Sequence, residues 1–134
     1  MIAKASWILK KIEYFKNKPQ QERIIHSAGE IIAYKKQAED ILSKRLLHFN
    51  AHYNFSYNRV TIKNVTTRWG SCSSKSNLNF NYKMALLPEE LVDYIVVHEL
   101  CHLREMNHSK KFWQLVEEKI PNHKELRKQL KFYQ

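Results

Sequence analysis

The sequence predicts a single α+β domain in which helices surround a small, three-stranded, mostly antiparallel sheet. Apolar residues recur at helical spacing in the first and last thirds of the chain, whereas apolar and polar residues alternate between positions 59 and 82. A length of 134 residues is enough for one hydrophobic core but not for two. We therefore expect residues 1–134 to form one domain, with residues 1–31 as an N-terminal extension and residues 32–134 as its core.

Two helices are expected before the sheet. Residues 1–18 form an amphipathic pattern that ends at Pro19, because proline cannot continue a helix. A stronger helix is expected from about Ile32 to His52, since apolar residues recur there at spacings of three and four. Arg45 lies on the apolar face of this second helix, and we expect its charged end to extend to solvent.

Three strands are expected in the middle of the chain. Residues 59–65 alternate apolar and polar side chains, which is typical of a half-buried strand. A second strand is expected over residues 68–73 and a third over residues 78–82. Because the four polar residues 74–77 between them favour a turn, we expect the last two strands to form an antiparallel hairpin.

The helices expected after the sheet cover residues 88–106, 110–119 and about 122–132. Pro88, followed by two glutamates, suits the first turn and the positive end of a helix. Ser109 is a good N-cap for the second of these helices. Pro121 ends it and separates it from the last, basic helix.

The first of these helices carries the sequence His98-Glu99-Leu100-Cys101-His102. Positions i and i+4 lie on one helix face, so His98 and His102 present two imidazoles to one point. Catalytic zinc sites use three protein ligands and keep a fourth position for water. Glu99 lies on the flank of this face, where its carboxylate reaches a metal-bound water and suits a general base. The spacing therefore predicts a hydrolytic zinc site.

His108 is the expected third ligand, because it follows the expected helix end at Asn107, where the chain can turn back toward the metal. The three histidines have the spacing of metzincin ligands, although the glycine of those enzymes is absent. A glutamate from the following helix, Glu117 or Glu118, is the alternative, as in gluzincins. We favour His108, since it lies in the loop directly after the metal helix.

Three motifs follow one another in a specific order: Arg68-Trp69-Gly70-Ser71-Cys72-Ser73, then Val97 to Leu103 around the two histidines, then Asn107-His108-Ser109 with Phe112-Trp113. Over roughly residues 33–130 they resemble the YgjP-like metallopeptidase domain, a family related to the SprT-like zincins. The resemblance implies a minimal zincin, with His98, His102 and His108 on Zn²⁺ and Glu99 as base. Family members of usual length carry an additional β-rich region before the long helix, where this chain has only about thirty residues.

The resemblance implies a zinc metalloendopeptidase acting on peptide or protein substrates, in which Glu99 takes the proton of a zinc-activated water. Arg68 and Trp69 are candidates for substrate binding. In that interpretation Arg68 stabilises a developing anion and the strand backbone pairs with an extended peptide. Alternatively, Trp69 fills core and Gly70 permits a close approach of another element.

Other cysteines and histidines are weaker candidates. Cys72 is either a latency ligand of the zinc or, as we favour, a small buried residue, and Cys101 is assigned to the core. His123, after Pro121, is a candidate for supporting a zinc ligand or for donating a hydrogen bond to the transition state. The histidines without ligand spacing are His26, His48 and His52.

The charge leaves two further functions open. The chain has 23 Lys and Arg against 13 Asp and Glu, a net charge of +10, which favours an anionic partner or a solvated basic surface. One alternative is a metal-dependent nucleoside triphosphate pyrophosphatase, although a Gly-rich phosphate loop and a carboxylate cluster for Mg²⁺ are absent. The other is a SprT-like protease or binding module associated with nucleic acid.

The sequence also predicts a cytoplasmic protein with no membrane partner. Two cysteines cannot make a disulfide framework, and the first 15 residues lack the continuous apolar core of a signal peptide. No apolar stretch approaches the roughly 18 residues needed to cross a bilayer.

Overall fold

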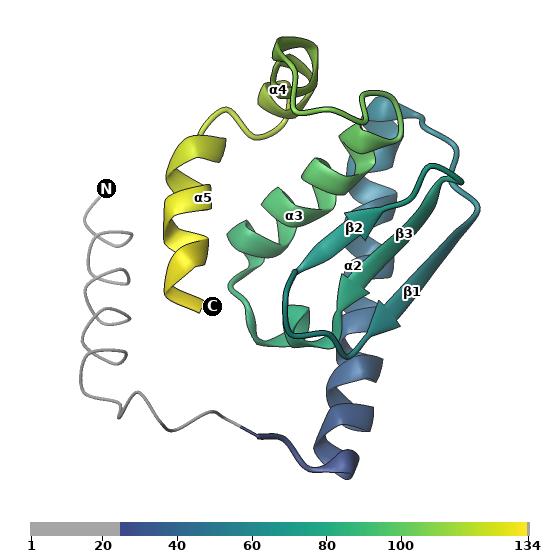
Figure 1. Ribbon diagram of the computed structural model, residues 1–134, viewed down its shortest axis with the longest axis vertical. Coiled ribbons are helices and arrows are strands. Elements are labelled where there is room, and N and C mark those ends of the chain that lie inside the picture. Colours follow the sequence, from purple (N-terminus) through teal and green to yellow (C-terminus); the bar gives the residue numbers. More distant parts are fainter. Residues whose placement is uncertain (1–24, 134) are drawn as a thin grey trace.

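The computed structural model describes residues 25–133, and the first helix in that range is α2 (Ala28–Tyr53; Figure 1). A capping box starts this helix. The Ser27 side chain accepts a hydrogen bond from the Glu30 N–H, and the Glu30 carboxylate accepts one from the Ser27 N–H. The box explains why α2 begins four residues earlier than its apolar pattern predicts. The helix expected over residues 1–18 lies outside the described residues.

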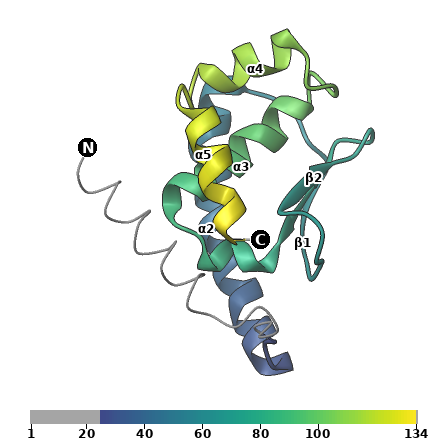
Figure 2. The ribbon, with the colours of Figure 1, turned by 60° about the vertical axis from the view of Figure 1, so that its left-hand side comes forward.

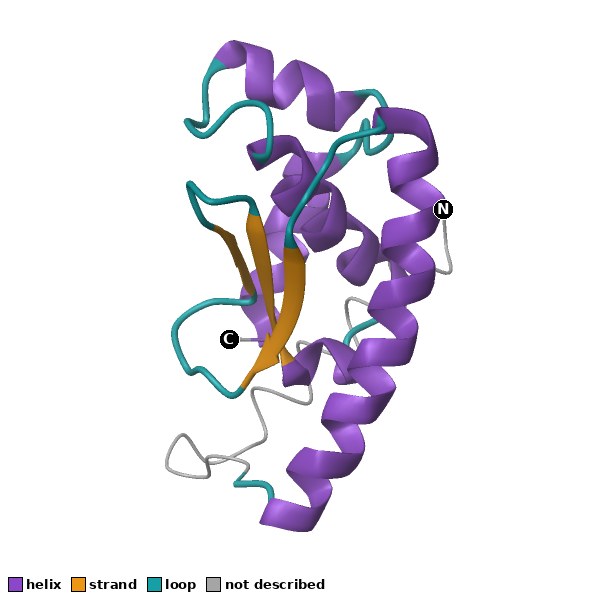
Figure 3. Cartoon of the chain, turned by 90° about the vertical axis from the view of Figure 1, so that its right-hand side faces the viewer, coloured by secondary structure: helices purple, strands orange, loops and turns teal. Residues whose placement is uncertain are grey.

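The three expected strands are present and lie side by side next to the long α2 (Figure 3). They are β1 (Arg59–Lys63), β2 (Gly70–Cys72) and β3 (Asn77–Asn81), in the spatial order β1-β3-β2. The antiparallel hairpin of β2 and β3 is confirmed. However, β1 pairs in parallel with β3, so the sheet is mixed and not mostly antiparallel.

The parallel pair arises because residues 64–69 cross the end of β3 before the chain enters β2. Asn81, at that end, holds the crossing segment. Its side-chain amide donates to the carbonyls of Val65 (2.7 Å) and Arg68 (3.2 Å), and its backbone N–H donates to the Trp69 carbonyl (2.8 Å). Alternation of apolar and polar residues identifies strands but not their neighbours, so the sequence pattern could not reveal this crossing.

The helix α3 (Glu89–His102) is the centre of the core. A short 3-10 helix, η1 (Tyr82–Leu86), leads into it from β3, and ten of the fourteen residues of α3 are buried. The helix contacts α2, β2, α4 and α5, and Figure 2 shows it between α5 and the sheet. The fully buried apolar side chains around it include Leu42, Leu78, Phe80, Met84, Phe112 and Val116.

Two more helices complete the fold, α4 (Lys110–Glu117) and α5 (His123–Leu130), followed by the 3-10 helix η2 (Lys131–Tyr133). Their positions agree with the sequence pattern to within two residues. The exception among the C-terminal helices is α3, which ends at His102, about four residues before its predicted end. No helix in the described range is long and apolar enough to cross a membrane.

Arg45 joins α2 to α3 through a two-pronged ion pair with Asp93. Its Nε lies 2.6 Å from Asp93 Oδ1 and its Nη2 lies 2.9 Å from Asp93 Oδ2, so the guanidinium does not extend freely to solvent as expected. Burial raises the pKa of the Asp93 carboxyl, although the neighbouring guanidinium acts in the opposite direction. The pair therefore satisfies a carboxylate that α3 carries close to the core.

We expect Arg45→Met to lower the free energy of unfolding by about 2 kcal/mol, because it leaves the Asp93 carboxylate without its charged hydrogen-bond donor. Urea unfolding at pH 7 measures the change. The double variant Arg45→Met/Asp93→Asn should recover part of the loss. An equal loss in both variants would show that packing, and not the unpaired charge, is responsible.

Candidate metal centre

Three histidine side chains converge beside α3. His98 and His102 lie one turn apart on this helix, and His108 comes from the loop that follows it. Their Nε2 atoms are separated by 3.2 Å (His98 to His102), 3.1 Å (His98 to His108) and 3.0 Å (His102 to His108). The structure therefore brings together the three residues that the sequence predicts as metal ligands.

The loop that carries His108 turns earlier than expected. The helix ends at His102, and the turn follows at once, with the Glu105 N–H donating to the Cys101 carbonyl. The His102 Nδ1–H donates to the Glu105 carbonyl at 3.0 Å and so holds the returning chain against the helix end. Ser109 then caps α4 through the Phe112 N–H. His108 therefore lies between the anchored turn at Glu105 and the capped start of α4.

Aromatic side chains of α4 orient the imidazoles. Phe112 is fully buried, and its ring stacks on His102 with centroids 4.4 Å apart and meets His98 edge-on at 5.0 Å. Trp113 stacks on His108 at 5.8 Å. The packing of Phe112 and Trp113 against these imidazoles restricts the rotation of all three rings.

Burial keeps the two helical histidines neutral. It lowers the pKa of His98 to about 3, with His102 and His108 acting in the same direction. Burial also lowers the pKa of His102, although its bond to the Glu105 carbonyl opposes this. Since that bond uses the Nδ1 proton of His102, its Nε2 carries a lone pair. The Nδ1 of His98 is buried and has no hydrogen-bond partner among the described residues.

This donor set fits a divalent metal ion. Three ligands held tetrahedrally at the zinc–nitrogen distance of 2.0–2.1 Å lie about 3.3–3.4 Å apart. The Nε2 separations of 3.0–3.2 Å are within a few tenths of an ångström of that value. Three nitrogen lone pairs that face one another repel unless a cation lies between them, and imidazole is a good ligand for zinc and its neighbours.

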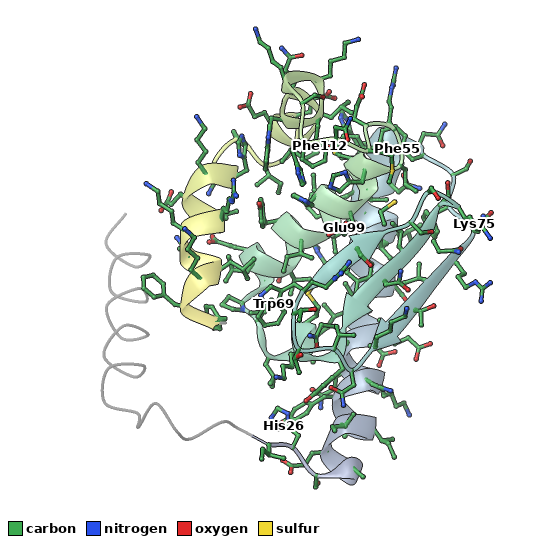
Figure 4. The ribbon with its side chains drawn as sticks, in the orientation of Figure 1. His26, Phe55, Trp69, Lys75, Glu99 and Phe112 are labelled. Atoms are coloured by element: carbon green, nitrogen blue, oxygen red, sulfur yellow. The ribbon has the colours of Figure 1, made fainter. Side chains whose placement is uncertain are left out.

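Glu99 lies next to this group, between α3 and β2 (Figure 4). Only 6% of its surface is exposed, and burial raises the pKa of its carboxyl to about 8, although the charge of Arg68 acts to lower it. Gly70 of β2 permits this position. A Cβ atom there would lie 3.1 Å from both Cγ and Oε2 of Glu99, so a larger residue would push the carboxylate away.

His98 and Glu99 open onto a hollow of about 300 Å³ at the junction of β2, α3 and α5. Its described lining residues are Trp69, Gly70, Tyr94, Ile95, His98, Glu99, Arg127, Leu130 and Lys131. A larger groove of about 720 Å³ lies between α2 and β1 and holds none of the candidate site residues. We assign the site to the smaller hollow, because it contains the histidine and the carboxylate.

The two predicted substrate-binding residues both lie at the entry to β2. Trp69 is half-buried. It packs against the core and also lines the hollow, so its position is compatible both with a structural role and with substrate binding. Arg68 is exposed, and its positive charge acts on the Glu99 carboxyl.

The two glutamates that were the alternative third ligands pair with other histidines. Glu117 lies 3.1 Å from His123, and Glu118 lies 2.9 Å from His52, so neither carboxylate joins the three histidines. His123 is buried and stacks on Trp113 at 4.8 Å, and it does not line the hollow. Among the described residues, Trp113 links it to the site by stacking on His108 as well.

Neither cysteine joins the histidines. Burial, with the Glu99 charge, raises the pKa of the Cys72 thiol to about 11, and the protonated thiol is a poor metal ligand. Cys101 is fully buried, which confirms its assignment to the core.

Tyr94, Arg127 and Lys131 line the hollow, and sequence reasoning missed them. Tyr94 had a signal, since it precedes His98 by four residues and therefore shares its helix face. Arg127 and Lys131 had none, because they reach the hollow only through the packing of α5 on α3.

Comparisons with known proteins agree with this geometry. The structure is similar to that of a metallopeptidase zymogen, abylysin of Pyrococcus abyssi, with 25% identity over 66% of this chain and 90% of that one, and a TM-score of 0.61. It is also similar to the metallopeptidase zymogen jannalysin of Methanocaldococcus jannaschii, with 28% identity, coverage of 69% and 91%, and a TM-score of 0.54.

These neighbours confirm the α+β fold of a minimal zincin. No curated protein matches the sequence. The family described as YgjP-like, metallopeptidase domain, matches residues 30–133, which is most of the chain and includes all three histidines and Glu99. The chain therefore belongs to the YgjP-like metallopeptidase family.

Proposed function

We propose that this chain is a zinc-dependent metalloendopeptidase, with His98, His102 and His108 as zinc ligands and Glu99 as general base. The observation that carries the proposal is the convergence of three imidazole nitrogens next to a buried carboxylate, at the edge of a hollow. Membership of a metallopeptidase family supports the same chemistry.

When bound, a zinc ion supplies Lewis-acid chemistry, which polarises a carbonyl group and makes water more acidic. Glu99 takes a proton from the attacking water at its carboxylate and gives it to the leaving amine as the peptide C–N bond breaks. In the metal-free protein burial raises the pKa of this carboxyl to about 8, and a cation bound at the histidines would lower it toward the ionised form that accepts a proton. Gly70 lets β2 approach and so holds Glu99 in place.

The edge of β2 is the proposed binding surface for the peptide. In the described sheet β2 pairs only with β3, so one side of its backbone is free to pair with an extended chain. A strand edge accepts a chain that continues in both directions, which favours cleavage at internal bonds. Arg68 and Trp69, at the entry to β2, are the proposed substrate contacts, and we propose that the Arg68 charge, which acts on Glu99, stabilises a developing anion.

We place peptide hydrolysis ahead of nucleotide hydrolysis. Among the described residues, the one group of three or more metal-binding side chains consists of imidazoles alone. Mg²⁺, the usual partner of nucleoside triphosphates, prefers oxygen ligands. We also expect a cytoplasmic location, since Cys72 and Cys101 are free thiols, as is usual in a reducing compartment.

Glu99→Gln should abolish hydrolysis while zinc stays bound, because the amide cannot accept the proton but occupies the same space. The measurement is cleavage of casein and of a quenched peptide library, with zinc content determined on the same samples. Wild-type protein with a chelator, and wild-type protein with UTP, are run in parallel. Undiminished peptide cleavage by the variant would rule out Glu99 as base, and UTP hydrolysis without peptide cleavage would favour the pyrophosphatase.

His108→Ala should weaken zinc binding by more than about 100-fold, since even residues that only support a ligand contribute 10–100-fold. Zinc affinity is measured by competition with a chromophoric chelator. Glu117→Gln is the matched control, because Glu117 pairs with His123 and is absent from the histidine group. The reverse pattern, with zinc lost from Glu117→Gln alone, would assign the third ligand to the glutamate.

The stability of the metal-free protein should respond to pH in two opposed ways. Burial of His98 lowers its pKa from 6.5 to about 3. Its contribution to the free energy of unfolding is therefore present above pH 6.5 and is lost as the pH falls toward 3. Burial of Glu99 raises its pKa from 4.5 to about 8. Its contribution to the free energy of unfolding is therefore present below pH 4.5 and is lost as the pH rises toward 8.

Urea unfolding with chelator, at pH 5.0 and 6.5, separates these contributions. Relative to wild type, Glu99→Gln should make stability rise more steeply with pH, and His98→Leu should make it rise less steeply or fall. If both variants changed the pH dependence of stability in the same direction, His98 and Glu99 could not both be buried, neutral groups.

A further inference from the structure

The hollow beside the candidate metal centre has a basic rim. Of its described lining residues, Arg127 and Lys131 are cations and Glu99 is the one acid. A third cation, Arg68, lies close enough for its charge to act on Glu99. Glu99 faces β2 and is almost fully buried, so the accessible charge at this opening is positive.

The two rim cations lie close together in the sequence, Arg127 in the last turn of α5 and Lys131 at the start of η2. Leu130 is buried against the core, and it lies between Arg127, three residues before it, and Lys131, directly after it. Both cationic residues are exposed, and neither forms a salt bridge with another residue of the described range. Their positive charge is therefore available to a ligand.

Much of the lining of the hollow is apolar. Four of its nine described lining residues are apolar or aromatic, namely Trp69, Tyr94, Ile95 and Leu130, and His98 and Glu99 share the lining with them. A volume of about 300 Å³ is at the small end of ligand sites, which suits one or two side chains and not a large cofactor. An apolar lining with exposed cations matches a side chain that has a short hydrocarbon stem and a negative tip.

We propose that this hollow is a specificity subsite that selects a carboxylate, in the first place a glutamate side chain of the peptide, next to the bond that is cleaved. This inference rests on the proposed peptidase function and adds the substrate class to it. Arg127 is the main partner of the carboxylate, because a guanidinium binds both carboxylate oxygens at once. Its charge also acts on Tyr94 and His98, two other lining residues of the hollow.

Binding is tested first, in the hydrolysis-deficient Glu99→Gln protein loaded with zinc. Fluorescein-labelled peptides that differ only by Glu, Gln or Lys at one position are titrated by fluorescence anisotropy. The Glu peptide should bind about threefold to fivefold tighter than the Gln peptide, as expected for a partly exposed ion pair. Adding Arg127→Glu to the same protein should reverse the order, so that the Lys peptide binds best.

Lys128→Gln is the matched control, because it removes one positive charge from the same helix without touching the hollow. It should leave the preference for Glu intact. Arg127→Gln, measured in parallel, should abolish the preference. An equal loss in Lys128→Gln would mean that only the general positive charge of the protein attracts the peptide.

Hydrolysis of the same peptides by the wild-type protein separates this inference from the proposed function. Cleavage of the Glu and Gln peptides at equal rates, with equal affinities, would overturn the subsite and leave the peptidase standing. Tight Glu-dependent binding without any cleavage would support the subsite and count against the peptidase. Failure to bind any of the peptides would overturn the inference.

Two further arms identify the source of the negative charge. Peptides with an internal Glu are compared with peptides whose carboxylate is the C-terminus, each with its amidated counterpart. A preference for the free C-terminus would support a carboxylate subsite and replace the glutamate by the chain end. Binding of a short single-stranded oligonucleotide that depends on Arg127, without discrimination between Glu and Gln peptides, would overturn the proposal in favour of a phosphate site.

Discussion

The burial of α3 is the constraint on which the candidate site depends. This helix has ten buried residues out of fourteen, and three of the ten are Glu99, His102 and Cys101. Polar groups in such a position must find partners or lose their charge. Burial accordingly raises the pKa of Glu99 and lowers the pKa of His98 and His102. The same packing that stabilises the domain therefore produces neutral imidazoles and a carboxyl that holds its proton more tightly than an exposed glutamate does.

A second requirement is that the sheet approach α3 closely. The segment that crosses the end of β3 is held by Asn81, and this brings β2 to the edge next to the helix. Gly70 then allows contact with Glu99, since any Cβ at that position would crowd the carboxylate. A mixed sheet, and not a simple meander, thus leaves a free strand edge beside the catalytic candidates.

Two neighbouring parts of the site suit ligands of opposite charge. The histidine group suits a cation, whereas Arg127, Lys131 and the nearby Arg68 suit an anion. These preferences are compatible because a peptide can place its carbonyl at the metal and a carboxylate at the rim. The net charge of +10 adds a long-range attraction for acidic substrates, which decreases with salt, whereas contact with Arg127 selects among them.

The sequence by itself determined the chemistry of the helix. The spacing of His98 and His102 places two imidazoles on one face, because the two residues lie one helical turn apart, and the motifs between residues 68 and 113 indicated the family. Helix and strand positions were largely predictable from local periodicity. The exceptions are the 3-10 helix η1, the start of α2, which the capping box at Ser27 sets, and the early end of α3, where a bond from His102 to the Glu105 carbonyl decides the turn.

Only the tertiary structure decided which distant residues join the site. It separated Glu117 from the histidines by pairing it with His123, and it made β1 parallel to β3 through the crossing at Asn81. It also brought Arg127 to the hollow through the packing of α5. Local periodicity carries no information about such contacts, because they depend on how whole elements pack around the buried α3.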